Sequence, residues 1–70
     1  MRTKVFEDNS KELRKLNKLT QRQVAERLKI YQPSYIRYEK GKSEPTLENL
    51  VKLADLFDVS VDYLLGRIDF

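Results

Sequence analysis

The sequence predicts an all-α fold in which five short helices form a single domain over residues 1–70. Apolar residues recur at intervals of three and four along most of the chain, and this spacing places them on one face of a helix. Residues that commonly start and end helices lie between the apolar segments. No run alternates between apolar and polar residues as a half-buried strand does. A chain of 70 residues buries only a thin core, so we expect it to pair with a copy or a partner.

The first predicted helix lies near the amino terminus. It carries three apolar residues on one face: Phe6, Leu13 and Leu16. Two residues could cap its start, because short polar side chains accept hydrogen bonds from the free N–H groups of the first turn. One is Thr3, and the other is Asn9, which has Glu12 three residues later.

The second predicted helix has a clear start. Thr20 followed by Gln23 has the spacing of a capping box. Three apolar residues then share one face: Val24, Ala25 and Leu28. The pattern ends near Lys29, so the next helix follows after a very short connection.

The third predicted helix begins around Gln32. Pro33 fits the first turn, because N–H groups there have no intrahelical partner. Gly41 ends the helix as a left-handed cap.

The fourth predicted helix is capped by Thr46 and has a broad apolar stripe, which indicates a helix central to the core. The stripe contains Leu47, Leu50, Val51, Leu53, Ala54, Leu56 and Phe57. Asp58 or Ser60 opens a short fifth helix, and Gly66 closes it.

Composition argues against an enzyme and against a metal or cofactor site. The chain has no cysteine and no histidine, so the commonest metal ligands and the commonest general base are missing. Its two glycines, Gly41 and Gly66, are too far apart for a phosphate-cradling loop. No apolar run reaches the roughly 20 residues that span a membrane, and the amino terminus lacks the apolar core of a signal peptide. We expect a cytoplasmic protein without catalytic residues.

Charge is unevenly distributed along the chain, whose net charge is +3. Residues 1–42 contain 12 Lys/Arg and 5 Asp/Glu, a balance of +7, whereas residues 43–70 contain 2 and 6, a balance of −4. This division favours one surface that binds a polyanion and another that is kept away from it. The alternative is a chance distribution over solvated helices.

The second and third helices have the features of a helix-turn-helix pair, in which two helices cross steeply after a short turn. Ala25 supplies a small side chain where the third helix packs, and Tyr35 and Tyr38 supply the inward face of that helix. The residues left facing outward are Tyr31, Gln32, Pro33, Ile36, Arg37 and Lys40. This edge suits entry into a DNA groove.

The run from Leu19 to Gly66 resembles the Cro/repressor-type helix-turn-helix family, also called the Xre or lambda-repressor-like family. The resemblance rests on the segments LTQ, VAERL, YEKGKSEP and LVKLADLFDVSVDYLLG, with Leu13 and Arg14 upstream. It implies a compact five-helix DNA-binding domain. It also implies a transcriptional regulator, with repression as the favoured mode, that acts as a homodimer on a double-stranded DNA operator.

The resemblance assigns roles to matching positions. Gln21 would hold a DNA phosphate at the start of the second helix, where N–H groups attract an anion. Lys40 and Lys42 would contact the DNA backbone, which positions a protein without specifying sequence. A recognition helix over about residues 32–40 would turn five residues towards base edges: Tyr31, Gln32, Pro33, Ile36 and Arg37. Each of these side chains could instead be an ordinary solvated or interface residue.

The resemblance has structural implications as well. Glu39 would form a structural ion pair with Arg14, because an unpaired acid on a DNA-facing helix would repel phosphate. Two positions depart from the family pattern. Lys29 stands where the family prefers glycine, and Ser10 stands at a usually apolar place in the first helix.

Two functions remain open from the sequence. The first is a sequence-specific DNA-binding regulator, and the second is an antitoxin-like adaptor that uses the same domain to bind a protein. No small-molecule ligand is indicated. Leu65, Ile68 and Phe70 are candidates for a dimer surface, with a frayed tail as the alternative.

Overall fold

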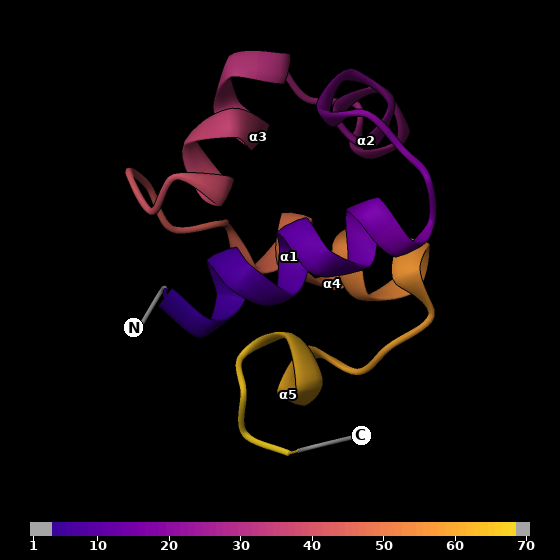
Figure 1. The fold of residues 1–70 in the computed structure, drawn as a ribbon. Coiled ribbons are helices and arrows are strands. Elements are labelled where there is room, and N and C mark those ends of the chain that lie inside the picture. The colour runs from indigo at the N-terminus through magenta and orange to yellow at the C-terminus, as the bar shows by residue number, and fades with distance from the viewer. Residues whose placement is uncertain (1–3, 69–70) are drawn as a thin grey trace.

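The computed structural model describes residues 4–68, and within that range it contains only helices and turns. The helices are α1 (Lys4–Leu16), α2 (Gln21–Leu28), α3 (Gln32–Glu39), α4 (Leu47–Phe57) and α5 (Val61–Leu64) (Figure 1). The predicted all-α fold is therefore confirmed. None of these helices is both long and apolar enough to cross a membrane.

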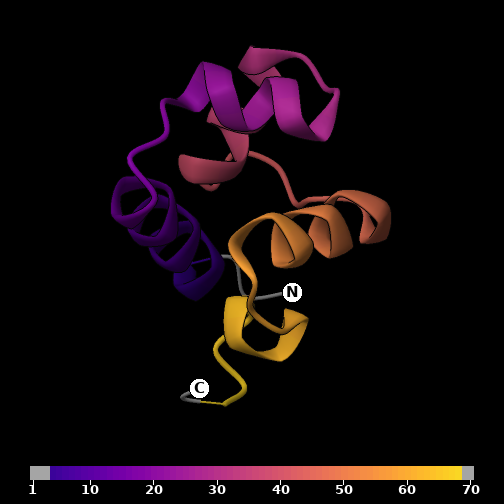
Figure 2. The same cartoon turned by 90° about the vertical axis from the view of Figure 1, so that its right-hand side faces the viewer.

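The helices surround one apolar core. α1 and α4 run through the middle of the molecule, with α2 and α3 on one side and α5 on the other (Figures 1 and 2). Every helix contributes to the core, which consists of Phe6, Leu13, Val24, Ala25, Leu28, Tyr35, Tyr38, Leu50, Leu53, Ala54, Phe57 and Leu64. The two tyrosines predicted to face inward from α3 are among them, so that prediction is confirmed.

Side-chain caps fix the starts of three helices. The predicted capping box is present, because the Gln23 N–H donates to Thr20 Oγ1 at 3.0 Å and the Thr20 N–H donates to Gln23 Oε1 at 2.8 Å. Thr46 caps α4 by accepting a backbone N–H at 3.1 Å. Ser60, rather than Asp58, caps α5 in the same way at 3.0 Å.

A left-handed residue follows each helix within two positions. These residues are Lys18 (φ 56°), Lys29 (φ 59°), Gly41 (φ 69°), Asp58 (φ 55°) and Gly66 (φ 75°). This conformation turns the chain away from the helix axis and satisfies the last carbonyls. The predicted glycine caps are confirmed, and the three other residues adopt the conformation despite the cost that a Cβ atom brings.

Three residues that the sequence assigned to the core are exposed. Leu16 is 70% exposed, Leu47 is 75% exposed and Val51 is 44% exposed. Leu16 is the last residue of α1, and Leu19 in the following turn packs against the core instead. Leu47 and Val51 lie on a flank of α4. The buried stripe of α4 is narrower than predicted and consists of Leu50, Leu53, Ala54 and Phe57.

The predicted alternatives near the chain ends are partly resolved. Asn9 does not cap α1; it lies inside the helix, and its Nδ2 donates to the carbonyl of Tyr63 at 2.9 Å, which joins α1 to α5. The other candidate cap, Thr3, lies outside the described residues. Phe70 of the suggested dimer surface also lies outside them, and Leu65 is half-buried against the core.

Both glycines of the chain lie against α1. A Cβ atom at Gly41 would overlap the carboxylate of Glu7, and one at Gly66 would overlap the side chain of Val5. Each glycine has a positive φ, and at Gly66 the branched side chain of Val5 leaves no room for a Cβ atom. The turns after α3 and after α5 are held against the amino-terminal part of α1 in this way.

Candidate functional site

The turn between α2 and α3 occupies residues 29–31. Lys29 is left-handed, and its N–H donates to the carbonyl of Glu26 at 3.1 Å. The N–H of Ile30 donates to the carbonyl of Ala25 at 3.0 Å, and its side chain packs against the core. Such paired bonds close a helix end firmly. The tight turn lets α3 pack directly against α2, as a helix-turn-helix pair requires (Figure 2).

α3 has a buried side and an exposed side. Tyr35, Tyr38 and Glu39 are buried. The exposed residues are Tyr31, Gln32, Pro33, Arg37 and Lys40, and Tyr31 alone is 82% exposed. Pro33 lies in the first turn, as expected. Ile36, which was predicted to face outward, is half-buried. The exposed side of α3 is therefore polar and basic, with one partly covered apolar residue.

The carboxylate of Glu39 joins three helices. Arg14 of α1 approaches it with two nitrogens: Nε donates to Oε2 at 2.7 Å and Nη2 donates to Oε1 at 3.2 Å. Gln21 of α2 also donates its Nε2 to Oε1, at 3.1 Å. Arg14 uses Nη1 to reach the carbonyl of Leu19 at 3.1 Å. The expected ion pair between α1 and α3 is thus present in the two-nitrogen geometry that binds carboxylates most strongly.

A chain of hydroxyl groups extends from this ion pair into the core. The hydroxyls of Ser10 and Tyr35 lie 2.9 Å apart, and Glu39 is close enough to raise the pKa of Tyr35. Ser10 is fully buried, so its unusual place in the first helix is explained by the phenol that it meets. We call these residues the buried polar cluster: Ser10, Arg14, Gln21, Tyr35 and Glu39. No buried side-chain nitrogen or oxygen among the described residues is left without a partner.

The buried polar cluster shifts the pKa values of its members. Burial alone would raise the pKa of Glu39, but hydrogen bonds from Arg14, Tyr35 and Gln21 outweigh it and hold the pKa below its ordinary value of 4.5. The hydrogen bond to Glu39 likewise raises the pKa of Arg14. Burial raises the pKa of Tyr35, and its bond to Glu39 adds to the effect. Glu39 is therefore ionised and Tyr35 neutral near pH 7.

Tyr38 anchors the other side of α3. Its hydroxyl accepts a hydrogen bond from Asn49 Nδ2 of α4 at 3.0 Å. Its ring meets Phe6 and Tyr35 edge-on, with ring centres 6.3 Å apart in each pair. Such aromatic contacts add to the stability gained from burial. Directional contacts to α1, α2 and α4 therefore fix α3 in place.

The remaining predicted residues lie near the carboxy-terminal end of α3. Lys40 and Lys42 are exposed after the helix, and Arg37 Nη2 donates to the carbonyl of Lys42 at 3.2 Å. Gln21 is half-buried, because its amide bonds Glu39. The first backbone N–H groups of α2 lie beside it and have no intrahelical acceptor. The structure thus brings the predicted residues together around α3 and the start of α2.

Two hydrogen bonds of the α3 tyrosines could not be read from the sequence pattern. These are the Ser10–Tyr35 and Asn49–Tyr38 hydrogen bonds. The available signal was a tyrosine at each inward position of α3, because a buried phenol needs a hydrogen-bond partner. Metal binding finds no support in the described residues, where no three acidic, histidine or cysteine residues are grouped to hold an ion.

Comparison with known proteins agrees with this geometry. A helix-turn-helix family model matches residues 11–64. The chain belongs to the Cro/repressor-type helix-turn-helix family. Among its relatives, the transcriptional regulator YobD of Bacillus subtilis is 51% identical over 59 residues, which are 84% of this chain and 53% of YobD. The cryptic phage CTXphi transcriptional repressor RstR of Vibrio cholerae is 44% identical over 64 residues, which are 91% of this chain and 56% of RstR.

A solved structure shows the same arrangement of helices. The crystal structure of a transcriptional regulator from Listeria innocua superposes with a TM-score of 0.84 at 33% identity, covering 90% of this chain and 59% of that one. The chain spans about half the length of the curated relatives it matches, 53% of YobD and 56% of RstR. The similarity therefore concerns about half of each relative.

Proposed function

We propose that this helix-turn-helix domain binds double-stranded DNA in a sequence-specific manner and regulates transcription. The main support is the two-sided α3, whose buried Tyr35, Tyr38 and Glu39 hold an exposed edge that includes Gln32 and Arg37. A rigidly held edge suits base recognition, because a binding group must be kept close to its productive geometry. The names of the relatives, which are transcriptional regulators and repressors, agree with this function.

α3 enters the major groove in this proposal. The amide of Gln32 matches the donor and acceptor pattern of adenine, and the guanidinium of Arg37 matches that of guanine. Tyr31, Pro33 and the half-buried Ile36 offer apolar surface to thymine methyl groups. A well-made two-point contact discriminates against the wrong base by about 1–3 kcal/mol, so Gln32 and Arg37 carry most of the sequence preference.

Backbone contacts flank the recognition helix. Lys40 and Lys42 lie exposed after α3 and would bind phosphates there. At the start of α2, the N–H groups that Thr20 does not cap would bind a phosphate next to Gln21. The balance of +7 over residues 1–42 supports this surface.

The regulator acts as a homodimer on a two-fold operator, in this proposal. Two copies would place their recognition helices one turn of duplex apart, about 34 Å. Leu65 and Ile68, both half-buried, remain candidates for the dimer surface. The protein would work by binding alone, without catalysis, in the cytoplasm and most simply as a repressor.

In vitro selection of duplexes tests the proposal. The wild-type protein should enrich one sequence, and footprinting should show paired half-sites. Arg37→Ala should relax the preference at one base pair and cost about 1–3 kcal/mol of binding. Arg67→Ala is the matched control, because Arg67 pairs with Asp62 next to α5. Affinity that does not change with salt on any duplex would reject DNA binding and favour the protein-interaction adaptor.

A further inference from the structure

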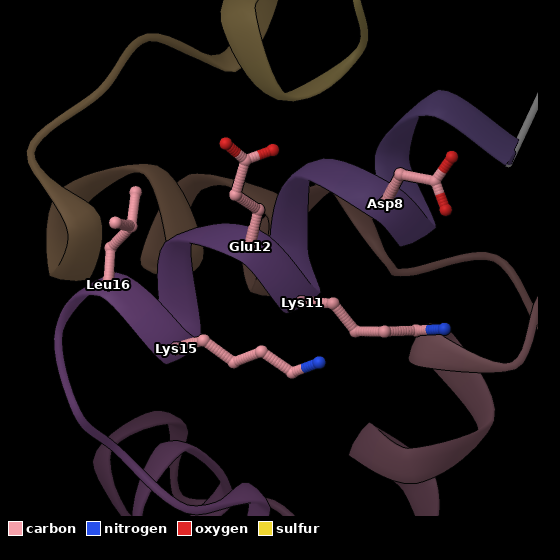
Figure 3. Close-up of a pocket in the computed structure, with 5 residues that line it drawn as sticks. All are labelled: Asp8, Lys11, Glu12, Lys15 and Leu16. Atoms are coloured by element: carbon pink, nitrogen blue, oxygen red, sulfur yellow. The ribbon is translucent and has the colours of Figure 1, made fainter.

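α1 presents a charged outer face that the proposed DNA contacts do not include. A shallow hollow of about 410 Å³ lies on it, lined by Asp8, Lys11, Glu12, Lys15 and Leu16 (Figure 3). Its size falls in the range of small-molecule sites, which are concave and bury most of their ligand. All of its lining residues belong to one helix, so no opposing wall encloses a small ligand. This face suits contact with a larger partner.

The lysines and Glu12 of this face point to different sides of α1, and its other acid, Asp8, pairs with Lys4. Lys11 and Lys15 extend towards the side of α1 on which α3 lies, whereas Glu12 and Leu16 point to the opposite side, towards α5 (Figure 3). A polyanion that approached α3 would therefore meet the lysines and avoid Glu12.

Contacts on either side of Lys11 place it beside the end of α3. One turn earlier, Glu7 lies against Gly41 in the loop after α3. One turn later, Arg14 pairs with Glu39 at the last residue of α3. Because Lys11 lies between these two contacts on the same helix, its ammonium group is near the loop that carries the proposed backbone contacts.

Lys11 and Lys15 also differ from the neutralised cations of the domain. Within residues 4–68, the cations that pair with carboxylates are Lys4, Arg14, Arg22, Lys52 and Arg67. Lys11 and Lys15 are not in this set, and neither are Lys40 and Lys42. Cations that are left unneutralised side by side repel one another and attract phosphate. Their placement beside α3 indicates an anionic partner on that side.

We propose that Lys11 and Lys15 bind the phosphate backbone of the same duplex that α3 reads. They form a second backbone contact alongside Lys40 and Lys42, and this inference rests on the proposed function. Long lysine side chains with no carboxylate partner can reach a phosphate without movement of the backbone. Such contacts raise affinity and fix the orientation of the domain without selecting bases.

The salt dependence of binding tests this assignment. The double variant Lys11→Gln/Lys15→Gln should reduce the slope of log K against log salt concentration by about 1.8, because each lost phosphate contact removes about 0.9. The reduction should be equal on selected and random duplexes, and the selected sequence should stay the same. Lys11→Arg/Lys15→Arg should keep the wild-type slope, because the positive charges remain.

Lys4→Gln/Arg67→Gln is the matched control. It removes the same net charge from exposed cations, but these are paired with Asp8 and Asp62. The inference would be overturned if log K for Lys11→Gln/Lys15→Gln fell with salt concentration as steeply as log K for the control. If Lys40→Gln lowers the slope at the same time, the proposed function survives and only the α1 contact is lost. A wild-type protein with no salt-dependent duplex binding would overturn both.

Discussion

α3 and α4 are held in the molecule by different kinds of contact. α3 is attached through the buried polar cluster, in which Arg14 and Ser10 meet Glu39 and Tyr35 through hydrogen bonds. α4 buries an apolar stripe of Leu50, Leu53, Ala54 and Phe57. Hydrogen bonds weaken steeply when their angle changes, whereas apolar burial depends mainly on area. The helix proposed to read DNA is thus the one whose rotation is fixed by direction-dependent contacts.

Because of this difference, we expect some substitutions to change the stability of the domain without changing the orientation of α3. Changes in the polar attachment should alter both how firmly the domain folds and how α3 is oriented. Changes in the apolar stripe of α4 should alter stability and leave the orientation of α3 intact. We interpret the buried polar cluster as a device that fixes the orientation of α3.

Arg14→Ala should have the largest effect. It leaves the carboxylate of Glu39 buried and without its main partner, which should cost about 3–5 kcal/mol of unfolding free energy. Urea denaturation measures the loss. Arg22→Ala is the control, because Arg22 and Glu26 pair at 3.1 Å on the exposed surface and such pairs contribute about 0–1 kcal/mol. Equal losses for the two variants would show that the buried polar cluster does not stabilise the fold.

Leu53→Ala should destabilise the domain by about 2–5 kcal/mol, through lost burial and the cavity left behind. Leu53 is fully buried, whereas Leu47 on the same helix is 75% exposed, so Leu47→Ala is a matched control with an expected change within about 0.5 kcal/mol. The folded Leu53→Ala protein should select the same DNA sequence as the wild type. An altered selected sequence would contradict the expectation that stability can change without the orientation of α3.

The stability of the domain should fall in acid because of Glu39. Its pKa is lower in the folded protein than the ordinary 4.5. The stabilisation is therefore fully present above the ordinary value and is lost as pH falls through the folded value. Urea denaturation from about pH 7 to about pH 3 should show this loss. Glu39→Gln should be less stable near neutral pH and should depend less on pH, whereas Leu53→Ala should keep the wild-type dependence.

Lys29→Gly should have the smallest effect, and it should stabilise. Lys29 is left-handed with φ 59°, a conformation that costs a residue with a Cβ atom about 1–2 kcal/mol. Glycine relieves that strain but adds about 0.5–1 kcal/mol of chain entropy, so the net gain should be about 0.5–1 kcal/mol. Lys29→Ala keeps the Cβ atom and should show no such gain in thermal denaturation. Lys29 belongs neither to the buried polar cluster nor to the apolar stripe of α4, so the selected DNA sequence should not change.

The sequence predicted those parts of the fold that depend on local chemistry. Thr20 with Gln23, Pro33 and Gly41 fixed helix boundaries through bonds within a few residues, and the structure has those boundaries. Leu47 was misplaced, because apolar spacing shows that a helix has an apolar stripe but not how much of it a neighbouring helix covers. That coverage is a property of the whole assembly.

Prediction of the site was limited because its contacts join residues that are far apart in the sequence. The Arg14–Glu39 pair was expected only from family resemblance, because nothing local connects residues 25 positions apart. The bond from Gln21 to the same carboxylate and the bond between Ser10 and Tyr35 were not foreseen. Each requires knowledge of which helix faces meet. The proposed phosphate contacts of Lys11 and Lys15 depend on the direction of these side chains relative to α3, which the sequence pattern does not give.

The two glycines that lie against α1 differ in what a side chain would meet there. Gly41 bears on Glu7 near α3, and Gly66 bears on Val5 next to α5. A Cβ atom at Gly66 would press on the branched side chain of Val5 and would strain a backbone with φ 75°. At Gly41 the flexible end of the Glu7 side chain could move aside. Gly66→Ala should consequently destabilise the domain, although it lies at the end of the molecule opposite α3.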